Sequence, residues 1–180
     1  EDLRTYTRLD DAKQEKVQVT DLINSTVHLV QTQYESITIK TDFSVNPTLL
    51  CFPSKLNQVF MNIIVNACQS IKTKLKQNHQ LNSSKEFEGL ITISTSMDND
   101  HLVIHIEDNG CGMDEQTKQR VCEPFFSTKD VGSGTGLGMA ISFGIIEEHD
   151  GMLKILSTFS QGSNFSVYLP LDNNSSDNKS

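Results

Sequence analysis

Positive charge and long apolar runs are both scarce in this sequence. It holds 15 Lys and Arg against 23 Asp and Glu, which gives a formal net charge of -8. A surface that binds a phosphate backbone needs clustered Lys and Arg, so nucleic acid is not an expected partner. The apolar runs are far shorter than the about 20 residues that span a bilayer, and the start lacks a secretory signal pattern. We therefore expect no direct membrane contact by these residues.

Metal-ligand and disulfide patterns are missing as well. The four cysteines, Cys51, Cys68, Cys111 and Cys122, form no C-x-x-C pair, and no histidine stands at zinc-ligand spacing. This composition indicates free thiols in a reducing compartment.

The length and the two ends predict one main domain. With 180 residues, 36% of them hydrophobic, the chain suffices for one core and is too short for two large domains. We place that domain at residues 15–171. Residues 1–14 begin without a methionine and suggest the end of an incoming helix and a linker. Residues 172–180 are all polar and are predicted to be disordered.

Periodicity in the first half predicts two helices and a strand. A short strand at residues 17–19 precedes a helix for which Thr20 is the expected N-cap. Residues 37–43 alternate between apolar and polar, as in a strand with one buried face. The segment with Pro47 and Pro53 is predicted to be a loop. From Ser54 to Ile71 apolar residues recur at helical spacing, and residues 74–88 are expected to form a surface loop.

The second half predicts two hairpins and two helices. Residues 91–97 and 102–106 form one hairpin around an Asp-Asn-Asp turn, and residues 153–155 and 165–169 form another. A short helix is expected at 115–121, and a longer one from Gly138 to His149, with His149 capping carbonyls and Gly151 as the C′ stop. Helices on one face of a mixed, largely antiparallel sheet of about five strands make an α+β two-layer sandwich.

Two asparagines on the long helix are candidate ligands for a hard cation. Asn62 and Asn66 are four residues apart and therefore lie on one helix face, beside the apolar stripe. Magnesium prefers oxygen ligands and commonly reaches a protein through one or two groups plus nucleotide phosphates. Taken alone, the two asparagines are more typical of solvated helix residues, and the glycine stretches further along the chain favour the ligand interpretation.

An acidic glycine stretch follows the strand at 102–106. Asp108 can accept a hydrogen bond from the exocyclic amine of adenine, whereas guanine would present a carbonyl there. Gly110 and Gly112 allow a sharp turn and a close approach to a flat base. The alternative is a simple Asp-Asn-Gly turn.

A second glycine run, Gly132-Ser-Gly134-Thr135-Gly136-Leu137-Gly138, fits neither the dinucleotide nor the P-loop pattern. It opens into a helix, whose free N–H groups can bind phosphate oxygens, and Lys129 can neutralise phosphate charge. The alternative is a flexible linker with a solvated lysine. Phe125 and Phe126, just before this run, are either ordinary core residues or part of a lid over a nucleotide.

Together these stretches resemble the catalytic and ATP-binding domain of sensor histidine kinases, in the superfamily shared with gyrase, heat-shock chaperone and mismatch-repair ATPases. The resemblance covers residues 15–171 and implies a Bergerat-type fold. Asn62 to Ala67 looks like the asparagine box, Asp108 to Met113 the first glycine box, and Glu123 to Lys129 the phenylalanine box. Gly134 to Gly138 and Gly162 to Phe165 look like the remaining glycine boxes.

The resemblance implies ATP and Mg²⁺ as ligands, with Asn66 holding the metal, Asp108 and Ser163 at the adenine, and residues 112–134 as an ATP lid. It implies transfer of the γ-phosphate to a histidine on a dimerisation domain, whose end resembles residues 1–14, and then to an aspartate of a response regulator receiver domain. It also implies a homodimeric full-length protein and a cytoplasmic location, including the cytoplasmic part of a membrane-anchored sensor. The set of implied nucleotide-site residues is Asn62, Asn66, Asp108, Gly110, Gly112, Met113, Phe125, Phe126, Lys129, Gly134, Thr135, Gly136, Leu137, Gly138 and Ser163.

Two departures from the family pattern matter. Gln69 stands where many members have Lys or Arg, so Lys129 is expected to take more of the phosphate contact. The phosphoacceptor histidine segment is absent from this sequence. The alternatives are a hydrolytic ATPase of the same superfamily, which needs a glutamate where Asn62 stands, and a degenerate nucleotide-binding module that only contacts partners.

Overall fold

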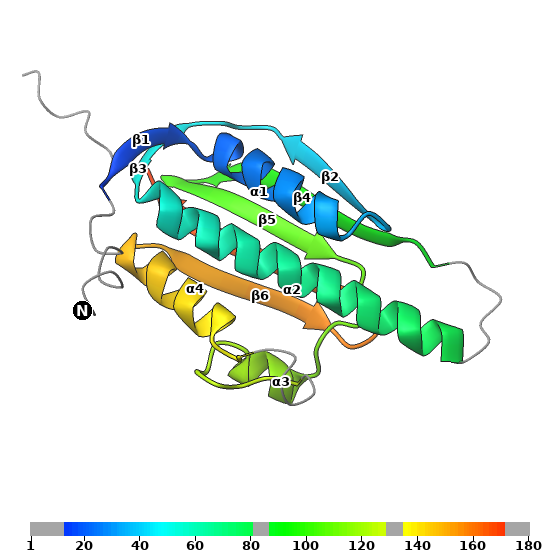
Figure 1. The fold of residues 1–180 in the computed structure, drawn as a ribbon. Helices are drawn as coiled ribbons and strands as arrows, with labels where there is room; N and C mark the ends of the chain where they lie inside the picture. Colours follow the sequence, from blue (N-terminus) through cyan, green and yellow to red (C-terminus); the bar gives the residue numbers. More distant parts are fainter. Residues whose placement is uncertain (1–12, 81–86, 129–134, 172–180) are drawn as a thin grey trace, which may run out of the picture.

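The protein is an α+β sandwich in which one face of a five-stranded sheet is covered by helices (Figure 1). The structure is a computed structural model that describes residues 13–80, 87–128 and 135–171. The strand order is β2-β4-β5-β7-β6, with β2 parallel to β4 and the other neighbours antiparallel. This architecture confirms the predicted two-layer fold. The covering helices are α1 (Val19–Gln33), α2 (Pro53–Gln80) and α4 (Gly138–Glu148).

Two predicted hairpins form the centre and one edge of the sheet. β4 (Gly89–Asp98) and β5 (His101–Asp108) are joined by a tight turn in which Asn99 has a φ of 52°. β6 (Met152–Thr158) and β7 (Gly162–Pro170) form the second hairpin. Both hairpins confirm the sequence prediction. Met97, however, is 42% exposed although it was expected to alternate with Ile91 and Ile93, because it lies beside the turn at the end of β4.

A second sheet, of two strands, was not predicted. β1 (Glu15–Gln18) pairs antiparallel with β3 (Thr48–Cys51). β3 lies in the segment between Pro47 and Pro53, which the sequence indicated to be a loop. Leu49 and Cys51 are buried on this short strand. The loop prediction was wrong because four residues are too few to show alternation, and the paired residues lie 30 or more positions earlier in the chain.

The start of α1 also differs from the prediction. The helix begins at Val19, with Gln18 as the N-cap residue and no side-chain cap bond. Thr20 is therefore not the N-cap, and its side chain is buried at 4% exposure. Because β1 runs directly into the helix and Val19 packs in the core, packing overrides the preference of Thr20 for the cap position.

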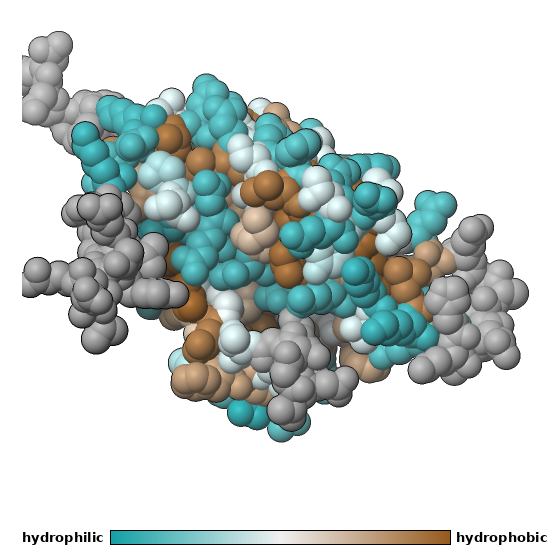
Figure 2. Space-filling view, viewed as in Figure 1, coloured by the Kyte–Doolittle hydropathy of each residue, from teal (hydrophilic) through white to brown (hydrophobic). Residues whose placement is uncertain are grey.

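The long helix α2 continues beyond its predicted end. Its buried side chains follow the expected stripe through Ile71, but the helix then runs on to Gln80, so a loop at residues 74–80 was the wrong prediction. Lys, Leu and Gln are good helix formers, and this end projects past the sheet in Figure 1, where no continuous apolar stripe is needed. Figure 2, which views the molecule from the side covered by the helices, shows mostly hydrophilic residues with separate hydrophobic patches among them. The fully buried α2 residues are Leu56, Val59, Phe60, Ile63, Ile64, Cys68 and Ile71.

The helices near the glycine stretches form largely where predicted. α3 (Glu115–Arg120) is capped by the carboxylate of Asp114, which accepts the Thr117 N–H at 2.7 Å. The end of α4 is closed by Asp150, which has a φ of 52°, while the Gly151 N–H donates to the Ile146 carbonyl at 2.9 Å. Gly151 is thus one residue past the C′ position predicted for it. It is needed there for space, since a Cβ would lie 2.5 Å from the Tyr168 carbonyl oxygen.

The predicted capping role of His149 is confirmed. Its Nδ1–H donates to the Ile145 carbonyl at 2.7 Å, and its Nε2 accepts the Phe52 N–H at 3.1 Å. These two bonds fix the tautomer of the ring and join the end of α4 to the loop before α2.

Candidate nucleotide site

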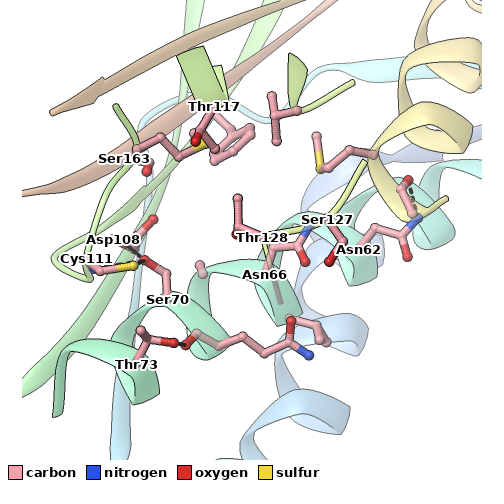
Figure 3. A pocket seen from close by; sticks show the side chains of 18 of the residues that line it. Asn62, Asn66, Ser70, Thr73, Asp108, Cys111, Thr117, Ser127, Thr128 and Ser163 are labelled. Carbon is pink, nitrogen blue, oxygen red and sulfur yellow. Dashed lines mark hydrogen bonds between the residues drawn. The ribbon is translucent and has the colours of Figure 1, made fainter. Parts of the chain in front are cut away.

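A cavity of about 800 Å³ opens between α2, the end of β5, α3 and the start of α4 (Figure 3). Its volume falls in the range typical of small-molecule and cofactor sites. The cavity brings together ten of the fifteen residues that the sequence assigned to a nucleotide site. Those ten are Asn62, Asn66, Asp108, Gly112, Met113, Phe126, Thr135, Gly136, Gly138 and Ser163.

The remaining five assigned residues divide into two groups. Gly110, Phe125 and Leu137 do not line the cavity, and Phe125 is 77% exposed, so of the adjacent phenylalanines only Phe126 faces inward. Phe126 packs against the Arg120 guanidinium, which lies 4.4 Å from its ring centroid. Lys129 and Gly134 lie outside the described residues, as do residues 1–12 and 172–180, for which a helix end and a disordered tail were predicted.

Asp108 is the buried acid of the cavity. It is the last residue of β5, and its side chain is 5% exposed. Its Oδ1 accepts the Gly110 N–H at 2.8 Å and the Ser70 hydroxyl at 3.3 Å. Burial raises the pKa of this carboxyl from 3.8 to about 6, although those two donors, the Lys74 ammonium and the backbone N–H of Ser163 oppose the rise. At neutral pH the group is therefore mostly a carboxylate, which can only accept hydrogen bonds.

Two residues of α2 that support the Asp108 loop were missed by the sequence analysis. Ser70 also accepts the Cys111 N–H at 3.0 Å, and Lys74 donates to the carbonyl oxygens of Asn109 (2.8 Å) and Ser160 (3.0 Å). Both follow Asn66 at intervals of four residues, which is the spacing that first indicated Asn62 and Asn66. Continuing that interval along α2 would have found them.

The two predicted asparagines lie on the cavity side of α2 and are half-buried. The amide nitrogen of Asn62 donates to the Gly138 carbonyl at 2.9 Å and to the Ser142 hydroxyl at 3.0 Å, which ties α2 to the first turn of α4. Asn66 stands one helical turn further along, between Asn62 and Ser70 (Figure 3). Its amide oxygen is the type of ligand that Mg²⁺ accepts.

The β6–β7 hairpin closes the cavity beside Asp108. Ser163 pairs with Asp108 across the sheet, and its hydroxyl lies 2.9 Å from that of Ser157. The Ser157 hydroxyl also accepts the Met113 N–H at 2.8 Å. Gly112 has a φ of 62°, and a Cβ there would lie 2.1 Å from the Thr158 carbonyl oxygen, so only glycine fits. The first glycine stretch is thus fastened to this hairpin.

The donor set of the cavity suits a cation that is shared with a ligand. Within residues 13–80, 87–128 and 135–171, no group of three or more His, Cys, Asp and Glu side chains could hold a metal ion. A dedicated all-protein metal cage is therefore not present in these ranges. Mg²⁺ keeps several waters and is commonly held by one or two protein oxygens plus phosphates, and Asn66 fits that requirement.

Residues 52–173 match the family described as "Histidine kinase-, DNA gyrase B-, and HSP90-like ATPase". The chain belongs to this ATPase family. Membership confirms the resemblance drawn from the glycine and asparagine stretches, and the family implies that the domain binds ATP. The chain is a catalytic, ATP-binding domain of the histidine kinase type.

The bacterial relatives of this histidine kinase-type domain are much longer proteins. It is 30% identical over 168 residues to Sporulation kinase E of Bacillus subtilis (strain 168), covering 92% of this chain and 21% of that protein. It is 32% identical over 176 residues to the signal transduction histidine-protein kinase AtoS of Escherichia coli (strain K12), covering 94% of this chain and 26% of that protein. The chain thus spans about a quarter or less of these relatives.

Solved structures show the same fold. The domain superposes on the mycobacterial sensor histidine kinase MprB with a TM-score of 0.72 at 21% identity, covering 88% of this chain and 97% of that chain. A nucleotide-free catalytic domain of histidine kinase ThkA gives the same TM-score and identity, covering 88% of this chain and 96% of that chain. In the part of the chain that the structure describes, no helix has the length and apolar character required to cross a membrane.

Proposed function

We propose that this domain binds ATP with Mg²⁺ and transfers the γ-phosphate to a histidine on a dimerisation domain of the same protein, for onward transfer to an aspartate of a response regulator receiver domain. The full-length protein is proposed to be a homodimer located in, or facing, the cytoplasm. The observation that supports this proposal most directly is the cavity itself, which places a buried acid at one end and an amide-bearing helix face along its side.

In this proposal Asp108 recognises adenine. Its carboxylate accepts a hydrogen bond from the exocyclic amine of the base, and Cys111 and Gly112 line the cavity beside it. The Ser163 hydroxyl, paired across the sheet from Asp108, supports that contact.

The phosphate end of the site lies toward α4. Asn66 would hold Mg²⁺, which supplies charge neutralisation at the phosphates when bound. Lys129 and the residues from Gly134 to Gly138, the first residue of α4, are proposed to contact the phosphates, with helix N–H groups pointing toward them. Phosphoryl transfer depends chiefly on positioning and electrostatic stabilisation, so the isolated domain should transfer little phosphate without its histidine-bearing partner.

The decisive experiment mixes the 180-residue chain with Mg²⁺, radiolabelled ATP and a separately produced dimerisation domain of the parent protein. Acid-labile, base-stable label on that domain is the expected result, and a histidine-to-glutamine version of the domain should remain unlabelled. The Asp108→Asn variant should reduce labelling at low ATP concentration. If ATP binds but no phosphohistidine forms under any mixing ratio, the transfer assignment is wrong.

A hydrolytic ATPase is less well supported by the site. Such an enzyme needs a carboxylate near the position of Asn62 to orient water, whereas the Asn62 amide is bonded to Gly138 and Ser142. We expect negligible ATP turnover by this chain alone. Rapid phosphate release that disappears on Asn62→Ala substitution would support the ATPase instead, and failure to bind any nucleotide would support a degenerate partner-binding module.

A further inference from the structure

The two carboxylate oxygens of Asp108 have different environments. Oδ1 accepts two hydrogen bonds, from the Gly110 N–H and the Ser70 hydroxyl. The Ser70 oxygen in turn accepts the Cys111 N–H at 3.0 Å and lies 3.4 Å from the Cys111 thiol. Because a carboxylate can only accept, the Ser70 hydroxyl directs its one proton at Asp108 Oδ1. Asp108 itself points into the cavity in Figure 3, so Oδ2 is the oxygen offered to a bound base.

A proton that binds to this carboxyl has one favourable position. On Oδ1 it would oppose two donors that already point at that oxygen, whereas on Oδ2 it would face the cavity. The protonated group therefore presents an O–H donor where the charged group presents an acceptor. At the edge of the base that would face Asp108, an amino-purine carries an exocyclic amine and an oxo-purine carries a carbonyl.

We propose that a proton on Oδ2 of Asp108 switches the base site from an acceptor that fits an amino-purine to a donor that fits an oxo-purine, and that Ser70 is a positioning residue that maintains the acceptor form. This inference rests on the proposed binding of ATP at Asp108. It adds a pH-dependent choice of base at that site.

The charges around Asp108 place this switch close to neutral pH. Burial raises the pKa of the carboxyl to about 6, while the Gly110 N–H, the Ser70 hydroxyl, the Lys74 ammonium on α2 and the Ser163 N–H on β7 oppose the rise. Cys68, also on α2, stays a neutral thiol because burial raises its pKa to about 12. The Cys111 thiol faces the same hydroxyl from the loop, while the neighbouring strands β4 and β7 place Ile91 and Ser163 opposite Asp108, and neither side chain titrates.

The test compares ATP with inosine triphosphate, which differs at the base and shares the triphosphate. Titration of the phosphates and binding of Mg²⁺ then cancel in the ratio of the two affinities. If ATP binds only the charged form and inosine triphosphate only the protonated form, this ratio falls by about tenfold for each unit of decreasing pH. We expect that trend between pH 8 and pH 5.5 in competition titrations with the 180-residue chain and Mg²⁺.

Three variants separate the switch from a structural role. Asp108→Asn places an amide donor permanently at the Oδ2 position, so its ratio should favour inosine triphosphate and be independent of pH. Ser70→Ala removes a donor to Oδ1 and should shift the whole profile upward by about one pH unit, or about tenfold in the ratio at fixed pH. Ser25→Ala, a matched control outside the cavity, removes an exposed hydroxyl of α1 that bonds the Asp21 carbonyl at 2.9 Å and should leave the profile unchanged.

Each outcome decides a separate point. A wild-type ratio that is constant with pH would overturn the switch, while ATP binding, and with it the proposed function, would stand. Equal weakening of both nucleotides by Ser70→Ala, with no shift along the pH axis, would reduce Ser70 to a structural residue. If Ser70→Ala does not fold, Ser70→Cys retains a weaker donor and should give a smaller upward shift. Binding of neither nucleotide at any pH would instead remove the proposed function.

Discussion

Replacing Asp108 by asparagine should stabilise the fold at neutral pH even as it weakens ATP binding. The carboxyl is 5% exposed, and burial raises its pKa from 3.8 to about 6. By linkage, this difference means that the charged form costs the folded state about 3 kcal/mol relative to the unfolded state. Asparagine keeps an oxygen that can accept from Gly110 and Ser70, and it carries no charge to desolvate.

The sign of the pH dependence follows from the raised pKa. Below about pH 3 the acid is largely protonated in both the folded and the unfolded chain, so Asp108 contributes almost no cost there. As the pH rises toward 7 the unfolded chain ionises first, and the wild-type protein loses stability that the variant keeps. The variant should therefore be more stable by up to about 3 kcal/mol at pH 7.5 and by much less at pH 4.0.

Urea unfolding at these two pH values measures the difference directly. Asp42→Asn, at an exposed position on β2, is the matched control and should change the unfolding free energy by less than about 0.5 kcal/mol. A variant that is less stable than wild type at pH 7.5, or a difference that is the same at both pH values, would refute the reasoning. A stabilised protein that binds ATP more weakly would show that this acid is kept for binding at a cost in stability.

Two other predictions test the glycine and asparagine stretches. Gly110→Ala should destabilise the protein by about 1–3 kcal/mol, because its Cβ would lie 2.2 Å from the Ser70 hydroxyl oxygen and 2.7 Å from Asp108 Oδ1. Gly144→Ala in α4, where a Cβ meets nothing within 4 Å, should instead stabilise the protein by about 0.5–1 kcal/mol. Equal effects of the two substitutions in thermal unfolding would contradict this account. Asn66→Asp should alter the ATP affinity measured with Mg²⁺ much more than the ATP affinity measured with EDTA. Asn24→Asp, at an exposed position on α1, should alter neither of these two affinities. An unchanged magnesium response of the Asn66 variant would remove Asn66 from the metal site.

The sequence predicted most of the fold because the sheet and helices have clear periods. The hairpins at β4–β5 and β6–β7 and the apolar stripe of α2 each span enough residues for alternation or helical spacing to be read. β3 could not be read in this way, since it is four residues long and its partner β1 lies far away in the sequence. The start of α1 was misplaced because burial of Val19 and Thr20, a tertiary effect, decides where that helix begins.

The sequence predicted which residues line the site better than it predicted the contacts that they make. Asp108, Asn62 and Asn66 stood out by residue type and spacing, and all three line the cavity. Ser70 and Lys74 did not, because serine and lysine are ordinary on a helix surface and their contacts cross from α2 to loops distant in sequence. The difference between the two oxygens of Asp108 depends on the direction of single hydrogen bonds, which no sequence pattern contains.

The bonds of Asn62 tie the beginning of α4 to α2 at the cavity itself. Its amide nitrogen is bonded to a backbone carbonyl and a hydroxyl of α4, while its backbone belongs to α2, one turn from Asn66. A displacement of the first turn of α4 must therefore either break these bonds or pull on the helix that presents Asn66. This amide therefore couples the beginning of α4 to the position of Asn66, so an event at α4 can alter the place where a cation would bind.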